Sequence, residues 1–364
     1  MTACDGCLRR TALVAALAAH VERARRNHRH IAELLALDDD GLLAALAGER
    51  RHELEAARDG FDPGGARERI ARAALHAVCR HDAGYPRRLA RTGDAPAVLH
   101  VAGDPARLAA LDDEHAPAVA VVGARRAGPE GLEVARGLGR GLAAAGVAVV
   151  SGMALGIDSA AHAGALEVGG PTIAVLAGGA DVPYPASKRG LYRALVQTQA
   201  VVSEMPPGFQ PFRWCFPARN RTIAALASLT IVVEATERSG SLITAEIAQD
   251  LGRPVGAVPG PVSAPRAAGS NALLRDGALV IRHAQDALDE VLGIGVATAL
   301  AGPRADGLAA PLRALLLRVE DGCDTVGRLA ATPAQAQAVL AGLAELELAG
   351  FLQRGPGGRY VRSA

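Results

Sequence analysis

Residues 119–152 read VAVVGARRAGPEGLEVARGLGRGLAAAGVAVVSG, and this stretch decides the fold class. A short apolar run ends at Gly123, a helical pattern follows over Pro129–Ala145, and a second apolar run covers Val147–Gly152. A strand, a glycine-containing loop, a helix and a second strand are typical of a βαβ unit, whose two strands are parallel. The stretch therefore predicts an α/β fold built on a parallel sheet.

The same alternation continues to Val258. Further strands are predicted over Thr172–Ala177, Val201–Glu204, Thr230–Glu234 and Val255–Val258, and further helices over Ile157–Val168, before Gln199, and over Arg221–Leu229 and Ser241–Leu251. Right-handed crossovers place the helices of such an open, Rossmann-like sheet over its faces, and ligands bind at the carboxyl ends of its strands. The loops that we expect to line one site follow Val122, Val150, Ala177 and Val233.

The flanks of this α/β region differ from it in pattern. Residues 1–95 predict a small helical module of the helical-hairpin, SAM-like type, and residues 96–295 the Rossmann-like domain. Residues 296–308 are rich in Gly, Pro and Ala and predict a linker. Residues 309–364 predict three helices and a β-hairpin, the layout of a winged helix. The third of these helices contains no arginine, which disfavours duplex-DNA binding by this domain.

Composition constrains the class of ligand. The chain has 364 residues with 39 basic and 38 acidic side chains, a net charge of +1, so any site for a polyanion must be a local patch. No apolar run reaches the roughly 18 residues of a membrane span. The N-terminus shows no cleavable apolar core. We therefore expect a cytoplasmic protein without a membrane segment.

Two of the predicted loops start helices and offer backbone amides or hydroxyls to an anion. The first, Gly123–Gly128, contains Arg125, which suits a phosphate, and it lacks the Gly-x-Gly-x-x-Gly spacing. Ser151-Gly152 stands where a dinucleotide site needs an acidic residue, so no dinucleotide cofactor is expected. The other anion cradle is the turn Ser239-Gly240-Ser241, for which ordinary helix capping is the alternative.

Asp158 and His162 follow Ser151 at a spacing that places them on one helical face. An acid/base or metal pair is one interpretation. The favoured one is an aspartate that caps the helix or orients the histidine beneath the loop.

The segment Pro206–Arg221 combines arginines with four of the six Phe and Trp residues of the chain. Three of the five Phe and the only Trp fall within residues 209–216. Arginine neutralises phosphate and aromatic rings stack on bases, a combination typical of single-strand sites. The alternative is a hydrophobic loop that fills a domain interface, and the two interpretations can overlap.

Two other kinds of site are excluded or disfavoured. A Walker A loop needs Gly-Lys followed by Ser or Thr, whereas the only lysine, Lys188, lies between Ser187 and Arg189, which excludes a P-loop ATPase. The five cysteines are odd in number and scattered, which argues against a disulfide framework. Cys4-x-x-Cys7 has no second pair at zinc spacing, so no metal is expected.

A series of short motifs occurs in one order along the chain. The motifs are Gly123-Ala-Arg125, Ser151-Gly-Met-Ala-Leu-Gly-Ile-Asp158 with His162, Tyr184-Pro185, Ser203-Glu-Met-Pro-Pro-Gly208, Phe216-Pro-Ala-Arg-Asn-Arg221, Ser239-Gly-Ser-Leu-Ile-Thr-Ala245, Pro259-Gly260 and Gly269-Ser-Asn271. In these motifs, from about Tyr85 to Leu292, the chain resembles the bacterial DprA/Smf family of DNA-processing proteins. It departs from the family at Gly128, where Ser or Thr is frequent, and at Ala225, where Gly is common.

The resemblance implies an extended Rossmann fold that holds single-stranded DNA, protects incoming strands in natural transformation and helps to load the RecA recombinase, typically as a homodimer. It implies a phosphate contact for Arg125, a charge and a stacking ring from Arg213 and Phe216, and backbone contacts from Lys188 or Arg189. The candidate DNA-binding residues are Gly123, Arg125, Ser151, Gly152, Lys188, Arg189, Arg213, Phe216, Arg219, Asn220, Arg221, Ser239, Gly240 and Ser241. No catalytic residue, cofactor or metal is implied, and the protein is expected not to be an enzyme.

One enzymatic alternative shares this type of fold, a nucleotide phosphoribohydrolase of the lysine-decarboxylase-like family. That family carries a Pro-Gly-Gly-x-Gly-Thr turn with glutamates on the next helix. Here the turn reads Arg238-Ser-Gly-Ser-Leu-Ile-Thr244 and the helix offers only Glu246. DNA binding is therefore the favoured interpretation.

Overall fold

The computed structural model describes residues 3–112, 116–294, 308–330 and 332–362. Contacts divide the chain into two compact units, residues 1–299 and residues 300–364. Within the described ranges no helix is both long and apolar enough to cross a membrane.

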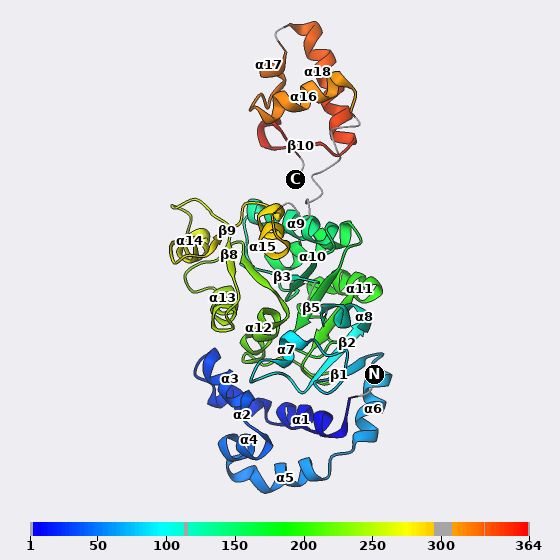
Figure 1. The fold of residues 1–364 in the computed structure, drawn as a ribbon, viewed down its shortest axis with the longest axis vertical. Helices are drawn as coiled ribbons and strands as arrows, with labels where there is room; N and C mark the ends of the chain where they lie inside the picture. Colours follow the sequence, from blue (N-terminus) through cyan, green and yellow to red (C-terminus); the bar gives the residue numbers. More distant parts are fainter. Residues whose placement is uncertain (1–2, 113–115, 295–307, 331, 363–364) are drawn as a thin grey trace. The chain divides into compact units, whose positions relative to one another are not determined.

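A nine-stranded sheet forms the centre of the first unit, with the strand order β1-β2-β6-β5-β4-β3-β7-β8-β9 (Figure 1). The strands are β1 (His76–Cys79), β2 (Val98–Gly103), β3 (Ala118–Val122), β4 (Ala148–Ser151), β5 (Thr172–Leu176), β6 (Ala200–Ser203), β7 (Leu229–Val232), β8 (Val255–Ala257) and β9 (Leu279–Val280). Strands β3 to β9 pair in parallel, and β1 and β2 are added antiparallel at one edge. The chain runs outward from β3 to β6 and returns to the other side of β3 with β7, so the strand order reverses between β3 and β7. The predicted Rossmann-like parallel sheet is confirmed, with its six predicted strands within two residues of their expected ends.

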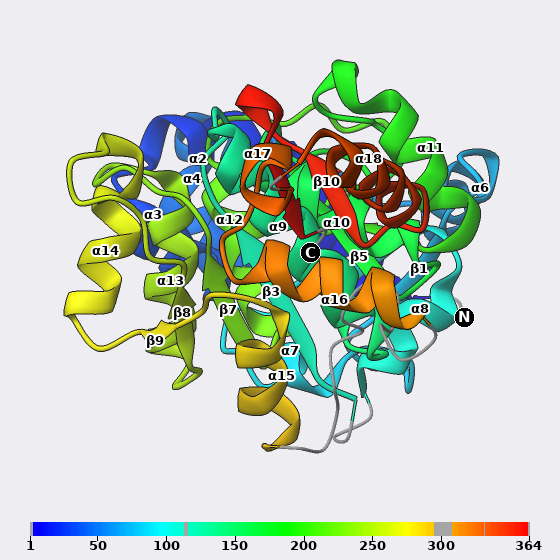
Figure 2. The ribbon, with the colours of Figure 1, turned by 90° about the horizontal axis from the view of Figure 1, so that it is seen from above.

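Helices cover both faces of the sheet. They are α7 (Arg87–Ala90), α8 (Pro105–Ala109), α9 (Pro129–Ala144), α10 (Ile157–Glu167), α11 (Arg189–Thr198), α12 (Cys215–Leu226), α13 (Gly240–Asp250), α14 (Ala268–Arg275) and α15 (Ala284–Leu292). Along β3, Ala118, Ala120 and Val122 enter the core shared with α12 and α13, whereas Val119 and Val121 enter the core shared with α9, α10 and α15. Both sides are apolar because successive strand residues point to opposite faces and each face is buried. Figure 2 shows α14 and α11 at opposite ends of the sheet.

The N-terminal module of the first unit is helical. Its helices are α1 (Asp5–Ala16), α2 (Ala18–Ala24), α3 (His28–Ala36), α4 (Asp39–Leu46), α5 (Arg51–Asp59) and α6 (Pro63–Arg72). Leu17, Leu42 and Leu43 lie at the centre of its core. The same core includes Trp214 and Cys215, so the module packs directly against the start of α12.

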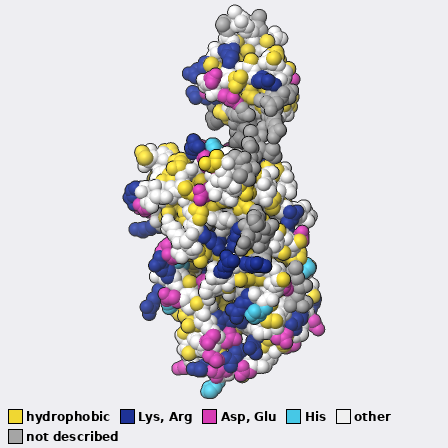
Figure 3. Space-filling model, in the orientation of Figure 1, with side chains coloured by type: hydrophobic (Ala, Val, Ile, Leu, Met, Phe, Trp, Pro, Cys, Tyr) yellow, Lys and Arg dark blue, Asp and Glu magenta, His cyan; other side chains and the backbone are white. Residues whose placement is uncertain are grey.

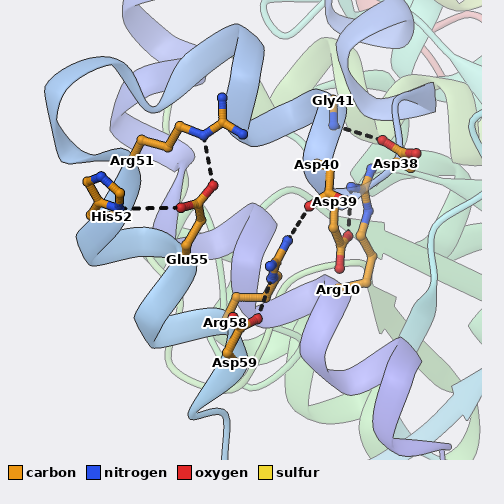
Figure 4. A network of polar contacts seen from close by, with 10 residues as sticks. All are labelled: Arg10, Asp38, Asp39, Asp40, Gly41, Arg51, His52, Glu55, Arg58 and Asp59. Atoms are coloured by element: carbon orange, nitrogen blue, oxygen red, sulfur yellow. Dashed lines mark hydrogen bonds and ion pairs between the residues drawn. The ribbon is translucent and has the colours of Figure 1, made fainter.

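Arginines bridge the helices of this module (Figure 4). Arg10 on α1 donates a hydrogen bond to the Asp39 carboxylate at 3.0 Å, and Arg58 on α5 donates to the Asp40 carboxylate at 2.5 Å. Partly exposed pairs of this kind contribute about 0–1 kcal/mol each. The stability of the module therefore rests on its apolar core.

Two elements differ from the sequence-based predictions. Residues 76–79, in a stretch expected to be helical, form β1 because they pair with β2 and bury three of their four side chains. The helix expected over Arg221–Leu229 runs over Cys215–Leu226 instead. Pro217 fits there because it is the third residue of the first turn, where the missing N–H has no partner in the helix.

The second unit contains α16 (Ala310–Glu320), α17 (Val326–Leu329), α18 (Pro333–Leu348), β10 (Leu352–Arg354) and β11 (Tyr360–Arg362). The two strands pair antiparallel, and Leu316, Leu343 and Tyr360 are buried in its core. Three helices followed by a hairpin are thus present, while the winged-helix assignment stays a prediction. The predicted linker, residues 296–308, lies outside the described residues except for Leu308. The domain boundary expected at residue 95 also stays a prediction.

Candidate nucleic-acid interface

Two adjoining cavities, of about 380 Å³ and 80 Å³, open at the carboxyl ends of the central strands. The loops after β3, β4, β5 and β7 all contribute lining residues, so the structure brings together the four loops expected to form one site. The residues that line both cavities are Arg125, Ala154, Phe216 and Arg219. The site adjoins β3 and β7, where the strand order reverses, which is where open α/β sheets bind ligands.

A cation and an aromatic ring line both cavities, and a second ring lies beside them. The guanidinium of Arg125, an exposed residue, lies 5.2 Å from the centroid of the half-buried Phe216 ring. The ring of Tyr184 is 5.5 Å from Phe216 and tilted by 56° to it. Tyr184 is 44% exposed and lines the smaller cavity. This ring was not among the predicted site residues, although the Tyr184-Pro185 motif marked its position. The group offers a positive charge beside a π-face.

The first loop differs from the expected anion site in one respect. The amide of Gly128, at the N-terminus of α9, donates to the carboxylate of Glu234 at 2.9 Å. The amide of Ala124 donates to the backbone oxygen of Glu234 at 2.7 Å. At Gly131, an added Cβ would lie 2.6 Å from this carboxylate, which explains the glycine. The Glu234 carboxylate thus occupies the N-terminus of α9. The exposed guanidinium of Arg125 is the cation that this loop presents to an anionic ligand.

Arg219 and Asp158 form a buried, oppositely charged floor. Arg219 donates to the backbone oxygen of Val175 at 2.8 Å, and its buried Nε has no hydrogen-bond partner within the described part of the chain. Burial lowers the pKa of Arg219 to about 10, while Asp158 opposes that change. Burial raises the pKa of Asp158, and Arg219 opposes it. A Cβ on Gly152 would lie 1.6 Å from the Arg219 guanidinium, so this position requires glycine.

Asp158 and His162 do not form an acid/base pair. Asp158 accepts hydrogen bonds from the amides of Gly152 and Ala154, at 3.1 and 3.4 Å. His162 is buried, and its Nδ1 lies 2.7 Å from the Thr172 hydroxyl. Burial lowers the pKa of His162 to about 3. The carboxylate holds the loop before α10 and the histidine is a buried core residue bonded to Thr172, so Asp158 neither caps the helix nor orients His162.

Lowering the pH from 7.5 to 5 should remove about 2 kcal/mol of stability through His162. Because the pKa of the buried ring is about 3, the folded protein stays unprotonated there, whereas the unfolded chain takes up a proton below about pH 6.5. This contribution is therefore complete above the unfolded pKa and is lost as the pH falls. Urea unfolding at pH 7.5 and 5 should show that His162→Gln loses about 2 kcal/mol less than the parent. His100, whose pKa burial lowers to about 4, remains in both proteins and cancels. Equal pH dependence in the two proteins would contradict this assignment.

The turn after β7 closes the larger cavity. Ser239 caps α13, and its hydroxyl lies 2.7 Å from that of Ser241. The side-chain amide of Asn220 donates to the backbone oxygen of Gly240 at 3.2 Å and links this turn to α12. All four residues line the larger cavity. The positive end of the α13 dipole therefore faces the site.

Several other predicted residues are not among those lining the two cavities. Lys188 is partly exposed, and Arg189 and Arg213 are exposed; these three are not among the residues lining the two cavities. The Ser151 hydroxyl donates to the backbone oxygen of Val121 at 2.6 Å and is buried.

Arg221 is buried and uses its donors within the protein. Its guanidinium forms an ion pair with Glu204 at 2.5 Å and lies 3.5 Å from the carboxylate of Asp94. These bonds hold α12 against the sheet. The geometry therefore favours a structural role for Arg221 in place of the expected DNA contact.

Within the aromatic segment 206–221, some side chains fit a hydrophobic interface and others fit a ligand site. Trp214 is fully buried, and its indole N–H donates to the backbone oxygen of Ala18 at 2.9 Å. Its backbone amide donates to Glu22 at 3.0 Å. Phe212 is 37% exposed, and Phe216 lines the cavities. Trp214 thus fills the interface with the helical module, whereas Phe216 is available to a ligand.

Charged side chains of both signs lie on the surface of the first unit. Figure 3 shows acidic and basic side chains interspersed over much of one face of the first unit, with a dense group of Lys and Arg near its middle.

The structure does not favour the hydrolase alternative. Glu246, the glutamate that this alternative requires, is paired with Arg29 at 2.8 Å and lies 3.4 Å from His28. Both partners belong to the helical module, and Glu246 is not among the residues lining the larger cavity.

Comparisons with known proteins bear on the family and the fold of the chain. The family model of DNA recombination-mediator protein A matches residues 76–292, which begin at β1. A putative DNA processing protein DprA of Mycobacterium tuberculosis is 50% identical over 184 residues, which cover 50% of this chain and 47% of that protein. The match thus spans about half the length of this relative. Protein Smf of Escherichia coli is 37% identical over 286 residues, covering 76% of this chain and 75% of that protein.

Two solved structures share the fold. DNA processing protein A (DprA) of Streptococcus pneumoniae superposes with a TM-score of 0.63 and 32% identity, over 80% of this chain and 99% of that chain. DNA processing protein A of Helicobacter pylori, described for its single-stranded DNA binding mode, superposes with a TM-score of 0.54 and 30% identity, over 60% of this chain and 95% of that chain.

Proposed function

Because the chain belongs to the DNA recombination-mediator protein A family, the DprA/Smf family of DNA-processing proteins, we propose that it binds single-stranded DNA at the two cavities above β3, β4, β5 and β7. The observation that carries the proposal is the Arg125 guanidinium 5.2 Å from the Phe216 ring, two groups that line both cavities. A phosphate and a neighbouring unpaired base need such a cation and such a ring side by side.

The loops supply separate parts of this interface. Arg125 binds a phosphate, and Phe216 stacks on a base with Tyr184 beside it. The α13 N-terminus, with its Ser239 and Ser241 hydroxyls, receives a second phosphate in the larger cavity. The cations Lys188, Arg189 and Arg213, which do not line the cavities, add contacts to the DNA backbone. Arg219 contributes buried charge from below.

Oligo-dT should bind more tightly than a duplex of equal length at the same salt concentration. A stacking ring needs an unpaired base, and the duplex hides its bases from it. Fluorescence anisotropy with labelled oligonucleotides over a range of salt concentrations measures both affinities. Equal or tighter binding of the duplex would contradict the proposal.

Replacing Arg125 with alanine should flatten the plot of log affinity against log salt concentration by about 0.7, the value for one phosphate contact on a single strand. The loss should be similar for all base sequences, since phosphate carries no sequence information. Arg126→Ala is the matched control: it is the next residue of the loop, is exposed, and is not among the residues lining either cavity. An unchanged slope in Arg125→Ala, or an equal change in both variants, would place the phosphate site elsewhere.

The wider activity follows the family resemblance. We propose that the protein protects incoming single strands, helps to load the RecA recombinase on them, acts as a homodimer, and works by binding and not by catalysis. We also propose that residues 309–364 form a winged helix, supported by the order α16, α17, α18 and the β10–β11 hairpin. The sequence of α18 contains no arginine, which disfavours DNA contact by this helix, and the single-strand site that we propose lies in the first unit.

A further inference from the structure

Four potential metal ligands from two distant segments meet at the edge of the sheet. They are Cys4, Cys7, Cys79 and His81, and their ligand atoms all lie within 4.8 Å of one another. Nδ1 of His81 is 3.4 Å from the sulfur of Cys4 and 3.5 Å from the sulfur of Cys7. The segments are 74 to 77 residues apart in the chain, so tertiary structure alone brings them together.

Local structure presents each ligand toward the same point. Cys4 is the N-cap residue of α1 and Cys7 lies in its first turn, so the Cys-x-x-Cys spacing places both sulfurs at one helix end. Cys79 is the last residue of β1, and its backbone oxygen accepts the amide of Asp82, which turns the chain and returns His81 toward the sulfurs. The pair Cys79-x-His81 supplies the second half that Cys4 and Cys7 lack in sequence, so the geometry favours a metal site that the spacing of Cys4 and Cys7 alone did not predict.

The donor set and spacing fit a tetrahedral ion. Zn–S bonds of about 2.3 Å and Zn–N bonds of about 2.0–2.1 Å place tetrahedral ligand atoms about 3.6–3.8 Å apart. The two sulfur–nitrogen distances here, 3.4 and 3.5 Å, are close to that separation. Three thiolates and one imidazole are a common ligand set of structural zinc, which leaves no open position for a substrate.

Burial also suits a structural ion that is bound after folding. Cys7 and Cys79 belong to the apolar core between α1, α6 and β1. Cys4 and His81 are exposed, which gives an ion access from solvent.

We propose that Cys4, Cys7, Cys79 and His81 together bind one Zn²⁺ ion that fastens α1 to β1. The ion crosslinks the first helix of the N-terminal module to the edge of the sheet. The module also packs on Trp214, two residues before Phe216, so the same ion stabilises the support of the DNA-binding loop.

Metal content of the purified full chain tests the proposal. Inductively coupled plasma mass spectrometry should find about one zinc per chain. Co²⁺ in place of zinc should give the visible d–d bands of a tetrahedral site and a thiolate charge-transfer band. Chelation should lower the melting temperature, because the ion binds the folded protein and a preformed site is absent from the unfolded chain.

Four variants and a control make the test specific. Cys7→Ser and Cys79→Ser should lower the zinc content at least tenfold. Because both side chains are buried and their loss can unfold the protein, Cys4→Ser and His81→Gln repeat the test at exposed positions. Cys323→Ser, in the second unit, should retain the full zinc content.

Two results would overturn the proposal. One is full zinc content in folded Cys4→Ser and His81→Gln. The other is a parent protein that, with its cysteines reduced, stays free of zinc after incubation with Zn²⁺. Neither readout involves DNA, so a failure here leaves the single-strand proposal unaffected.

Discussion

Replacing Arg221 with alanine is expected to lower the free energy of unfolding by about 3–5 kcal/mol. Arg221 and Glu204 form an ion pair at 2.5 Å, with both side chains only 7% exposed. The Thr222 hydroxyl also donates to Glu204, so the carboxylate is held from two sides. Removing the guanidinium leaves a buried carboxylate without its cation, which costs far more than the net value of the pair.

The pH dependence of this variant gives a second signature. Burial raises the pKa of Glu204, and Arg221 opposes that rise in the parent. Without Arg221 the pKa of the folded carboxyl rises further above its unfolded value. The deficit of the variant should therefore be largest at neutral pH and should shrink as the pH falls toward 5, where the buried carboxyl takes up a proton.

Urea unfolding of the parent, Arg221→Ala and Arg221→Ala/Glu204→Gln measures both effects. The double variant, which carries no buried charge at this pair, should recover part of the loss. Arg213→Ala is the control, since this exposed arginine of the same segment should change stability by less than about 0.5 kcal/mol. A loss below about 1 kcal/mol in Arg221→Ala would show that the pair is not essential to the fold.

Replacing Phe216 with alanine is expected to weaken single-strand binding by about 1–3 kcal/mol, or about 5- to 150-fold. The ring lies beside the Arg125 guanidinium at 5.2 Å and the Tyr184 ring at 5.5 Å, so a base that enters this cluster meets an aromatic face next to a cation. Stacking involves no displaced counterion, so the salt slope should stay nearly unchanged while the intercept moves.

The matched variants separate stacking from packing, because Phe216 also contacts the core near Trp214. Phe216→Tyr should retain most of the affinity because it keeps the ring. Phe216→Leu keeps apolar volume but has no π-face, so it should bind as weakly as Phe216→Ala. Melting temperatures confirm that each variant is folded. Parental affinity in a folded Phe216→Leu protein would show that the ring is structural.

The sheet was predictable because its signal is local. Each parallel strand is buried on both faces, so runs such as Val119–Val122 are apolar throughout and end at a glycine or a polar residue. The loops that follow these strands must then meet at one edge, whatever their sequence. Strand β1 escaped prediction because its identity depends on pairing with β2, which the sequence near His76 does not encode.

The site was predictable in position but not in the roles of its residues. Two aromatic residues, Trp214 and Phe216, and two arginines, Arg219 and Arg221, lie within eight residues. The start of α12 nevertheless turns the members of each pair toward different surroundings. Glu204, which fixes Arg221, is distant in sequence. The cluster of Cys4, Cys7, Cys79 and His81 is likewise a product of long-range packing.

The carboxylate of Glu234 sits at the end of α9, where a nucleotide-binding protein of this fold receives a phosphate. The carboxylate competes with any small anion for the hydrogen bond of the Gly128 amide. A free nucleotide has one compact phosphate group, and the position at this amide is already occupied by the Glu234 carboxylate. A strand has a row of phosphates and can pass the occupied position while its neighbours reach Arg125 and α13. If the proposed function is correct, this side chain favours a polymer over a free nucleotide at the site.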